Sequence, residues 1–278
     1  MEVTWKQPDG AGGYEVVHHE TTAEMVKYSD TTVANLLSET NVVNISDFMS
    51  SLLTAANAGE IRRAIKADKT PFYDETGKYW KAYGTPDFFE DATIGNCLYC
   101  RENGIYTADK VTFGGSSFTL EVKGGANDTP AYSVFFHAQP EKYDTTYAGS
   151  ILFICDNAKL NVYISDTTGT AILSQVFSAV NPVLAWHHYE LDYDHAARTA
   201  YVFADGELIH TQTGITIESA GRYLGLGLDL ARFTSNAFGG WLNYFRLSNI
   251  CRHSADFTPP AGKPVADEYT LSLLNFER

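Results

Sequence analysis

The stretch WHHYELDYDHAARTAYVFADGEL, residues 186–208, decides the fold because it contains two strands and their turns. Apolar and polar residues alternate from 187 to 193, and a period of two predicts a strand with one apolar face. A polar turn precedes a second alternating run at 199–204. Asp205-Gly206 ends this run and favours a hairpin, because both residues tolerate positive φ. The stretch therefore predicts an antiparallel sheet.

A second stretch, WLNYFRLSNICRHSADFTPP at 241–260, completes a pattern with the first. The stretch at 186–208 fits a hairpin motif that begins with W-H-H, continues with alternating hydrophobic residues and Tyr-Asp, and ends at Asp-Gly. The stretch at 241–260 fits a strand that ends in R-L-S-N and is followed by F-T-P-P. FGGSSFTLEV at 113–122 fits an early strand, with Ser117 where Asp is common, and ADEYTLSLLNF at 266–276 fits a closing strand. Together these motifs resemble the laminin-G-like, concanavalin A-like lectin family.

The resemblance implies an all-β fold, a two-sheet antiparallel jelly-roll sandwich at residues 70–278, whose closing strand pairs near the domain's start. Runs of Tyr, Phe, Val and Ile separated by turn residues agree with a sandwich. The family is mostly a carbohydrate- and protein-binding scaffold, so the fold does not fix the ligand. We expect strands at 78–83, 97–101, 119–123, 132–137, 150–155, 159–165, 175–178, 187–193, 199–204, 223–228, 241–248 and 270–276.

The N-terminal part differs in character. We expect residues 1–40 to form an attachment arm with a short strand at 14–18, and residues 41–69 to form a helical linker or oligomerisation segment. The runs at 21–26 and 32–37 resemble the N-terminal segment of prophage tail-fibre proteins, and an ordinary N-terminal arm is the alternative. Short apolar helices need partners, so we expect a homotrimer through this part.

Composition and charge argue against several partners. The net charge is −14 and the pI about 4.9, whereas binding to nucleic acid or anionic lipid needs a basic surface. No N-terminal signal peptide is apparent, and no apolar run is long enough to span a membrane. We therefore expect cytoplasmic synthesis and a final place in a virion tail or outside the cell. The CxxC at 97–100 lacks a second pair at metal-site spacing, so we expect free thiols.

Glu190, Asp192 and Asp194 project from the face opposite the apolar one. The run resembles the catalytic strand of β-glucanases, and retaining hydrolysis needs two carboxyls about 5 Å apart. The third acid is Asp rather than Glu, however, and the flanks are those of the non-catalytic hairpin. We therefore expect a solvated face, no catalytic residues and no enzyme. On this hypothesis Glu190→Gln and Asp192→Asn leave activity unchanged.

Loop acids are the candidate metal ligands. Asp128, Asp144 and Asp166 lie in connections between expected strands, and carboxylate oxygens suit Ca²⁺. Ordinary turn chemistry is the alternative. The adjacent histidines at 18–19 and 187–188 face opposite sides of a strand, so neither pair can chelate one ion.

Loop aromatic residues are the candidate glycan ligands, because their rings can stack on sugars; edge packing is the alternative. The residues chosen are Tyr143, Asp144, Tyr147, Arg232 and Phe233.

The sequence thus favours a phage or prophage tail-fibre or receptor-binding protein. Its jelly roll would bind a host cell-surface glycan without cleaving it, and its N-terminal part would contact other virion proteins. The alternatives are a glycan hydrolase of the concanavalin A-like glucanase type, and a structural virion or adhesion module with a protein ligand.

Overall fold

The computed structural model separates into two compact units, residues 1–69 and 70–278. It describes residues 72–276 apart from 92–94, 102, 128–131, 184 and 234–235, and four short strands of the first unit. These are β1 (Trp5–Pro8), which pairs with β2 (Tyr14–Val17), and β3 (Lys27–Tyr28), which pairs with β4 (Thr31–Thr32). The strand expected at 14–18 is confirmed by β2. The helical segment expected at 41–69 lies outside the described residues.

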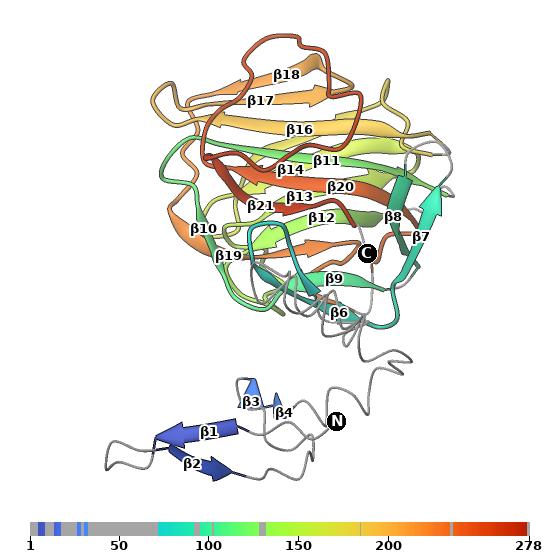
Figure 1. Ribbon diagram of the computed structural model, residues 1–278. Coiled ribbons are helices and arrows are strands. Elements are labelled where there is room, and N and C mark those ends of the chain that lie inside the picture. The colour runs from blue at the N-terminus through green and yellow to red at the C-terminus, as the bar shows by residue number, and fades with distance from the viewer. Residues whose placement is uncertain are drawn as a thin grey trace. The chain divides into compact units, whose positions relative to one another are not determined.

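The second unit is an all-β sandwich of two antiparallel sheets, as expected (Figure 1). The first sheet has the order β15-β14-β13-β12-β19-β9-β6-β5, with β10 also on β19. Its strands are β5 (Phe72–Tyr73), β6 (Tyr79–Tyr83), β9 (Gly104–Thr107), β10 (Val111–Phe113), β12 (Ser133–Gln139), β13 (Ile151–Asp156), β14 (Lys159–Ser165), β15 (Ala171–Phe177) and β19 (Ala220–Leu226).

The second sheet carries the features that matter for function. Its order is β18-β17-β16-β11-β20-β8-β7, with β21 also on β20. Its strands are β7 (Asp87–Asp91), β8 (Gly95–Cys100), β11 (Phe118–Ala126), β16 (His187–Asp194), β17 (Thr199–Ala204), β18 (Glu207–Thr213), β20 (Gly240–Ser248) and β21 (Thr270–Leu274). The backbone N–H of Glu75 donates to Leu273 at 2.9 Å, so β21 closes near the start of the unit, as expected.

The core lies between the two sheets. Tyr189, Leu191 and Tyr193 of β16 are buried in it, which confirms the apolar face predicted for this strand. Phe245 of β20 links the layers, because its ring stacks on Phe136 of β12 at 5.4 Å between centroids. Alternation then places the even-numbered residues of β16 on the outer face of the second sheet.

The β17–β18 hairpin anchors a long connection. Asp205 and Gly206 have φ values of 51° and 83°, which confirms the turn predicted from Asp-Gly. Gly206 also accepts a hydrogen bond from the Phe257 N–H at 2.9 Å, and a Cβ on Gly206 would lie 2.1 Å from the Phe257 carbonyl oxygen. The chain between β20 and β21 therefore arches closely over β16, β17 and β18 (Figure 1). We call residues 249–262 the covering segment.

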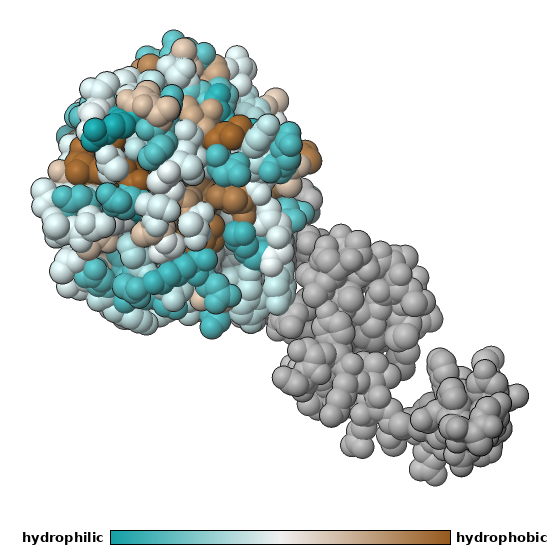
Figure 2. All heavy atoms as spheres, turned by 90° about the vertical axis from the view of Figure 1, so that its left-hand side faces the viewer, coloured by the Kyte–Doolittle hydropathy of each residue, from teal (hydrophilic) through white to brown (hydrophobic). Residues whose placement is uncertain are grey.

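The surface of the second unit offers no single large apolar face in the view of Figure 2, where hydrophobic residues form small patches among hydrophilic ones. Within the described residues, no helix is sufficiently long and apolar for a membrane span. Cys97, Cys100 and Cys155 are buried, and Cys251 is partly exposed.

Candidate functional site

Buried acids occupy the outer face of the second sheet, so the prediction of a solvated face is wrong. Glu121 of β11 and Glu190 and Asp192 of β16 are all fully buried. The physical reason is the covering segment, which packs on this face. The backbone N–H groups of Arg252 and His253 donate to Asp192 Oδ1 at 2.6 and 3.2 Å. Asp192 thus holds the covering segment against the sheet.

Strand register brings the charged groups together. Glu121 lies directly opposite Glu190 on one side and Arg246 of β20 on the other. The Arg246 guanidinium donates from Nε to Glu121 Oε2, and His253 Nδ1 lies 2.5 Å from Glu190 Oε1. His188 Nε2 lies 3.5 Å from Glu121 Oε1 and 3.7 Å from Glu190 Oε2. One guanidinium and two imidazoles therefore face a group of carboxyls shielded from water.

This setting shifts the pKa values in different directions. Burial raises the pKa of Glu190 to about 7 and that of Asp192 to about 9, and in Asp192 the neighbouring Glu190 adds to the rise. Burial also opposes ionisation of Glu121, but the nearby His188 ring and the hydrogen bond and charge of Arg246 outweigh it and lower its pKa. Glu121 is thus the ionised partner of Arg246, whereas Glu190 and Asp192 retain protons more readily than exposed acids.

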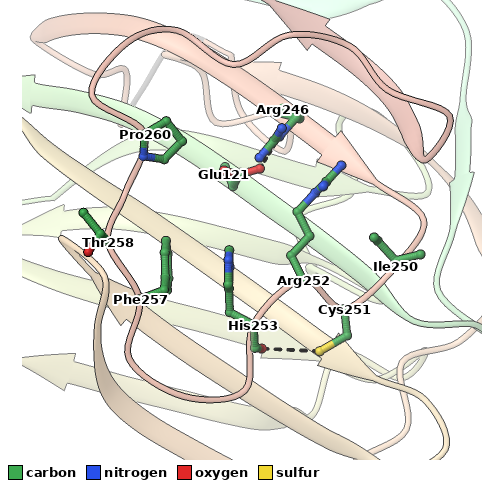
Figure 3. Close-up of a pocket in the computed structure, with 9 residues that line it drawn as sticks. All are labelled: Glu121, Arg246, Ile250, Cys251, Arg252, His253, Phe257, Thr258 and Pro260. Carbon is green, nitrogen blue, oxygen red and sulfur yellow. Dashed lines mark hydrogen bonds and ion pairs between the residues drawn. The ribbon is translucent and has the colours of Figure 1, made fainter.

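A hollow of about 310 Å³ lies between the covering segment and the sheet (Figure 3). Glu121 and Arg246 face each other in it, and the His253 and Phe257 rings stack at 3.7 Å. Neither Glu190 nor Asp192 lines the hollow. The residues lining it are Glu121, Arg246, Ile250, Cys251, Arg252, His253, Phe257, Thr258 and Pro260.

Three partly exposed aromatic rings form a second feature of this sheet, which we call the aromatic strip: Tyr99, Trp186 and Trp241. Trp241 pairs with Tyr99 on β8 and with Gly125 on β11. Its ring lies 5.8 Å from Tyr99 and 6.3 Å from Trp186. A Cβ on Gly125 would lie 2.1 Å from the Ala185 carbonyl oxygen, so glycine is needed for the chain before β16 to approach.

The predicted glycan ligands come together at another place, around the buried Asp229. The Tyr147 hydroxyl donates to Asp229 Oδ2 at 2.7 Å, and Arg232 Nη1 lies 3.3 Å from the same oxygen. Phe233 is only 2% exposed and stacks under Tyr143 at 4.7 Å. Phe233 is therefore a packing residue here, whereas Tyr143 is exposed.

The structure describes two of the three predicted calcium ligands, Asp144 and Asp166, and each accepts hydrogen bonds within its own turn. Asp144 Oδ1 accepts hydrogen bonds from Thr146, and Asp166 Oδ1 accepts them from Thr168. These bonds lower the pKa of both carboxyls. Asp128 lies outside the described residues. Within the described part of the chain, the groups able to surround an ion lie instead in the buried acid and histidine cluster.

His137 of β12 allows a test of the Asp229 region. The Leu230 N–H donates to its Nδ1 at 3.0 Å, and burial lowers its pKa, so the ring is neutral although Asp229 Oδ1 lies 3.3 Å away. The unfolded chain therefore binds the proton more readily, and the contribution of His137 to stability falls as pH drops below about 6.5. Chemical denaturation at pH 7.5 and 5.5 should show that the parent protein loses stability relative to His137→Gln on acidification, a comparison in which the opposite contributions of Glu190 and Asp192 cancel. Exposed His195→Gln is the control; an unchanged pH dependence in His137→Gln would contradict the assignment.

Sequence reasoning missed Glu121, His188, His253 and the aromatic strip as site residues. Glu121 and Glu190 are 69 positions apart, and only the register of β11 against β16 makes them neighbours. The available signal was alternation, which places both on outer faces once the two strands are known to pair.

Comparison with known proteins gives similarity in architecture only. No protein-family model and no curated protein matches the chain. It is similar to the CBM40 of Ruminococcus gnavus IT-sialidase bound to α2,3-sialyllactose, with 15% identity over 54% of this chain and 91% of that one, and a TM-score of 0.44. It is also similar to domain 4 of AbnA, a GH43 extracellular arabinanase from Geobacillus stearothermophilus, in complex with arabinotriose. The identity is 13%, the match covers 60% of this chain and 81% of that one, and the TM-score is 0.42.

A phage protein is similar to the same degree. Tailspike protein 2 of Escherichia coli O157:H7 bacteriophage CAB120 has 12% identity, with 65% of this chain and 26% of that chain covered, and a TM-score of 0.46. At these identities and TM-scores, what those proteins bind does not transfer to this chain.

Proposed function

We propose that the second unit is a glycan-binding domain that holds its ligand on the aromatic strip. The observation that carries this proposal is a row of partly exposed rings: Tyr99 and Trp241 lie on neighbouring strands of one sheet, and Trp186 lies just before β16. Aromatic faces bind the C–H faces of sugar rings, while polar neighbours hydrogen-bond to the hydroxyls. Asn127 supplies such a neighbour, since its Nδ2 donates to the Tyr99 hydroxyl at 3.1 Å.

We propose further that binding is not followed by cleavage. Hydrolysis of a glycosidic bond requires two carboxyl groups to reach the sugar. Glu190 and Asp192 are fully buried, do not line the hollow, and hold the covering segment through Asp192 and His253. Their contacts with the covering segment give Glu190 and Asp192 a stabilising role in the fold. A hydrolase remains the alternative, favoured by two carboxyls on one strand, and requires the covering segment to move away.

The proposed biological setting is a phage or prophage tail fibre. Its support is the resemblance of residues 21–26 and 32–37 to tail-fibre N-terminal segments. The net charge of −14 suits a ligand without phosphate groups. A homotrimer through residues 1–68 would link three weak sites and raise avidity by about 10²–10⁴-fold without new contacts.

A glycan array probed with the full chain tests the proposal. We expect selective retention on a set of related glycans, and no retention on duplex DNA or anionic vesicles. Repeating the array in EDTA tests the calcium hypothesis, since loss of signal would require a metal in recognition. Binding to a purified host surface protein but to no glycan would replace this function with the protein-ligand alternative.

A further inference from the structure

We propose that Glu121, His188 and Glu190 bind a divalent transition-metal ion, with Zn²⁺ the best fit. We call these three residues the buried triad. They come from neighbouring strands β11 and β16, and all three are buried beneath the covering segment. This proposal is independent of glycan binding, because the buried triad and the aromatic strip share no residue.

The spacing of the donor atoms fits a tetrahedral ion. His188 Nε2 lies 3.5 Å from Glu121 Oε1 and 3.7 Å from Glu190 Oε2. Zinc bonds of about 2.0–2.1 Å at tetrahedral angles separate ligand atoms by about 3.3–3.4 Å. His188 Nε2 is therefore within a few tenths of an ångström of this separation from each carboxylate oxygen, and the three donor atoms all lie within 4.8 Å of one another. One imidazole with two carboxylates is a donor set that suits Zn²⁺, whereas Ca²⁺ takes six to eight oxygens.

Unpartnered buried atoms point independently to a missing ligand. His188 is 3% exposed, and neither of its ring nitrogens has a hydrogen-bond partner among the described residues. Glu121 Oε1 and Glu190 Oε2, the two oxygens nearest His188 Nε2, also lack one. Orphaned polar atoms in a protein interior are costly and uncommon. A cation among these atoms would satisfy one nitrogen and both oxygens at once.

The neighbours of the buried triad already orient its ligands. Arg246 binds Glu121 through Oε2, and His253 contacts Glu190 through Oε1, so each carboxylate keeps its other oxygen facing His188. Such outer partners fix ligand geometry in metal sites. A bound divalent cation would also offset the repulsion of two carboxylates directly opposite each other on adjacent strands. Because Glu121 lines the hollow, the hollow provides an entry route and space for a water as fourth ligand.

The test measures metal binding to the full chain after EDTA treatment and removal of the chelator. Calorimetric titration of the chain with ZnCl₂ should show binding, and the variants below assign it to the buried triad. Addition of Co²⁺ should give the visible absorption of a tetrahedral site. His188→Gln should weaken affinity at this site by more than about 100-fold, since losing an outer-shell partner alone costs 10–100-fold. His187→Gln, which alters the adjacent histidine bound to Asp205, should retain the site.

A second measurement covers the case in which His188→Gln does not fold. Zinc-edge anomalous diffraction from crystals of the unaltered protein should place an ion between Glu121, His188 and Glu190. Equal zinc binding by folded His188→Gln and the parent protein would overturn the proposal. So would an anomalous map of zinc-soaked crystals without a peak at the buried triad.

Discussion

Arg246→Met is expected to lower the free energy of unfolding by about 3–5 kcal/mol, because it leaves Glu121 as an unpaired buried charge. Arg246 donates to Glu121 Oε2. This pairing helps to lower the pKa of Glu121, although burial of the carboxyl acts in the opposite direction. Methionine keeps most of the side-chain volume, so the loss measures the missing charge rather than a cavity. Urea denaturation at pH 7.5 in EDTA gives the value without a contribution from bound metal.

Two further variants decide whether charge pairing is the cause. Glu121→Leu combined with Arg246→Met removes both charges and should recover much of the loss, since apolar replacements of a buried pair are often neutral. Exposed Arg198→Met is the control and should change stability by less than about 0.5 kcal/mol. If the loss of unfolding free energy in the double variant equals the sum of the losses in Arg246→Met and Glu121→Leu, the two residues do not act as a pair.

Trp241→Ala is expected to weaken glycan binding by about 30-fold or more, the effect of losing an aromatic anchor worth roughly 2 kcal/mol. Trp241 is the central ring of the aromatic strip, between Tyr99 and Trp186. Trp186→Ala removes an end of the strip and should weaken binding less. Calorimetric titration with the glycan selected by the array provides both affinities.

The control for this series is Tyr269→Ala, which removes an exposed ring outside the aromatic strip. It should leave affinity unchanged, and circular dichroism should show that all variants fold. If Tyr143→Ala abolishes binding while Trp241→Ala does not, the ligand site is at the loops chosen from the sequence and the aromatic strip is a packing feature.

Local patterns were sufficient to predict much of the fold. The strand runs at 159–165 and 199–204 coincide with β14 and β17, and the Asp205-Gly206 turn has the positive φ angles that the dipeptide favours. These features depend on neighbouring residues alone. β7, β9 and β10 were not predicted, because they are short and owe their existence to pairing with distant strands.

The candidate site depended on long-range contacts and could be predicted only in part. Alternation correctly placed Glu190 and Asp192 on the outer face of β16. Whether that face meets water depends on where the covering segment lies, and its contacts with Asp192 span about sixty residues of sequence. Likewise, Trp241 and Trp186 were visible in the sequence, but their proximity follows from strand order.

The central claim, binding without cleavage on the aromatic strip, is tested most directly by incubating the full chain with its array-selected glycan and analysing the sugar by mass spectrometry. The account predicts that the glycan binds, is recovered intact after prolonged incubation, and is bound equally well by folded Glu190→Gln, while Trp241→Ala binds poorly. Shortened glycan products that disappear in Glu190→Gln would contradict it and identify a hydrolase whose covering segment opens.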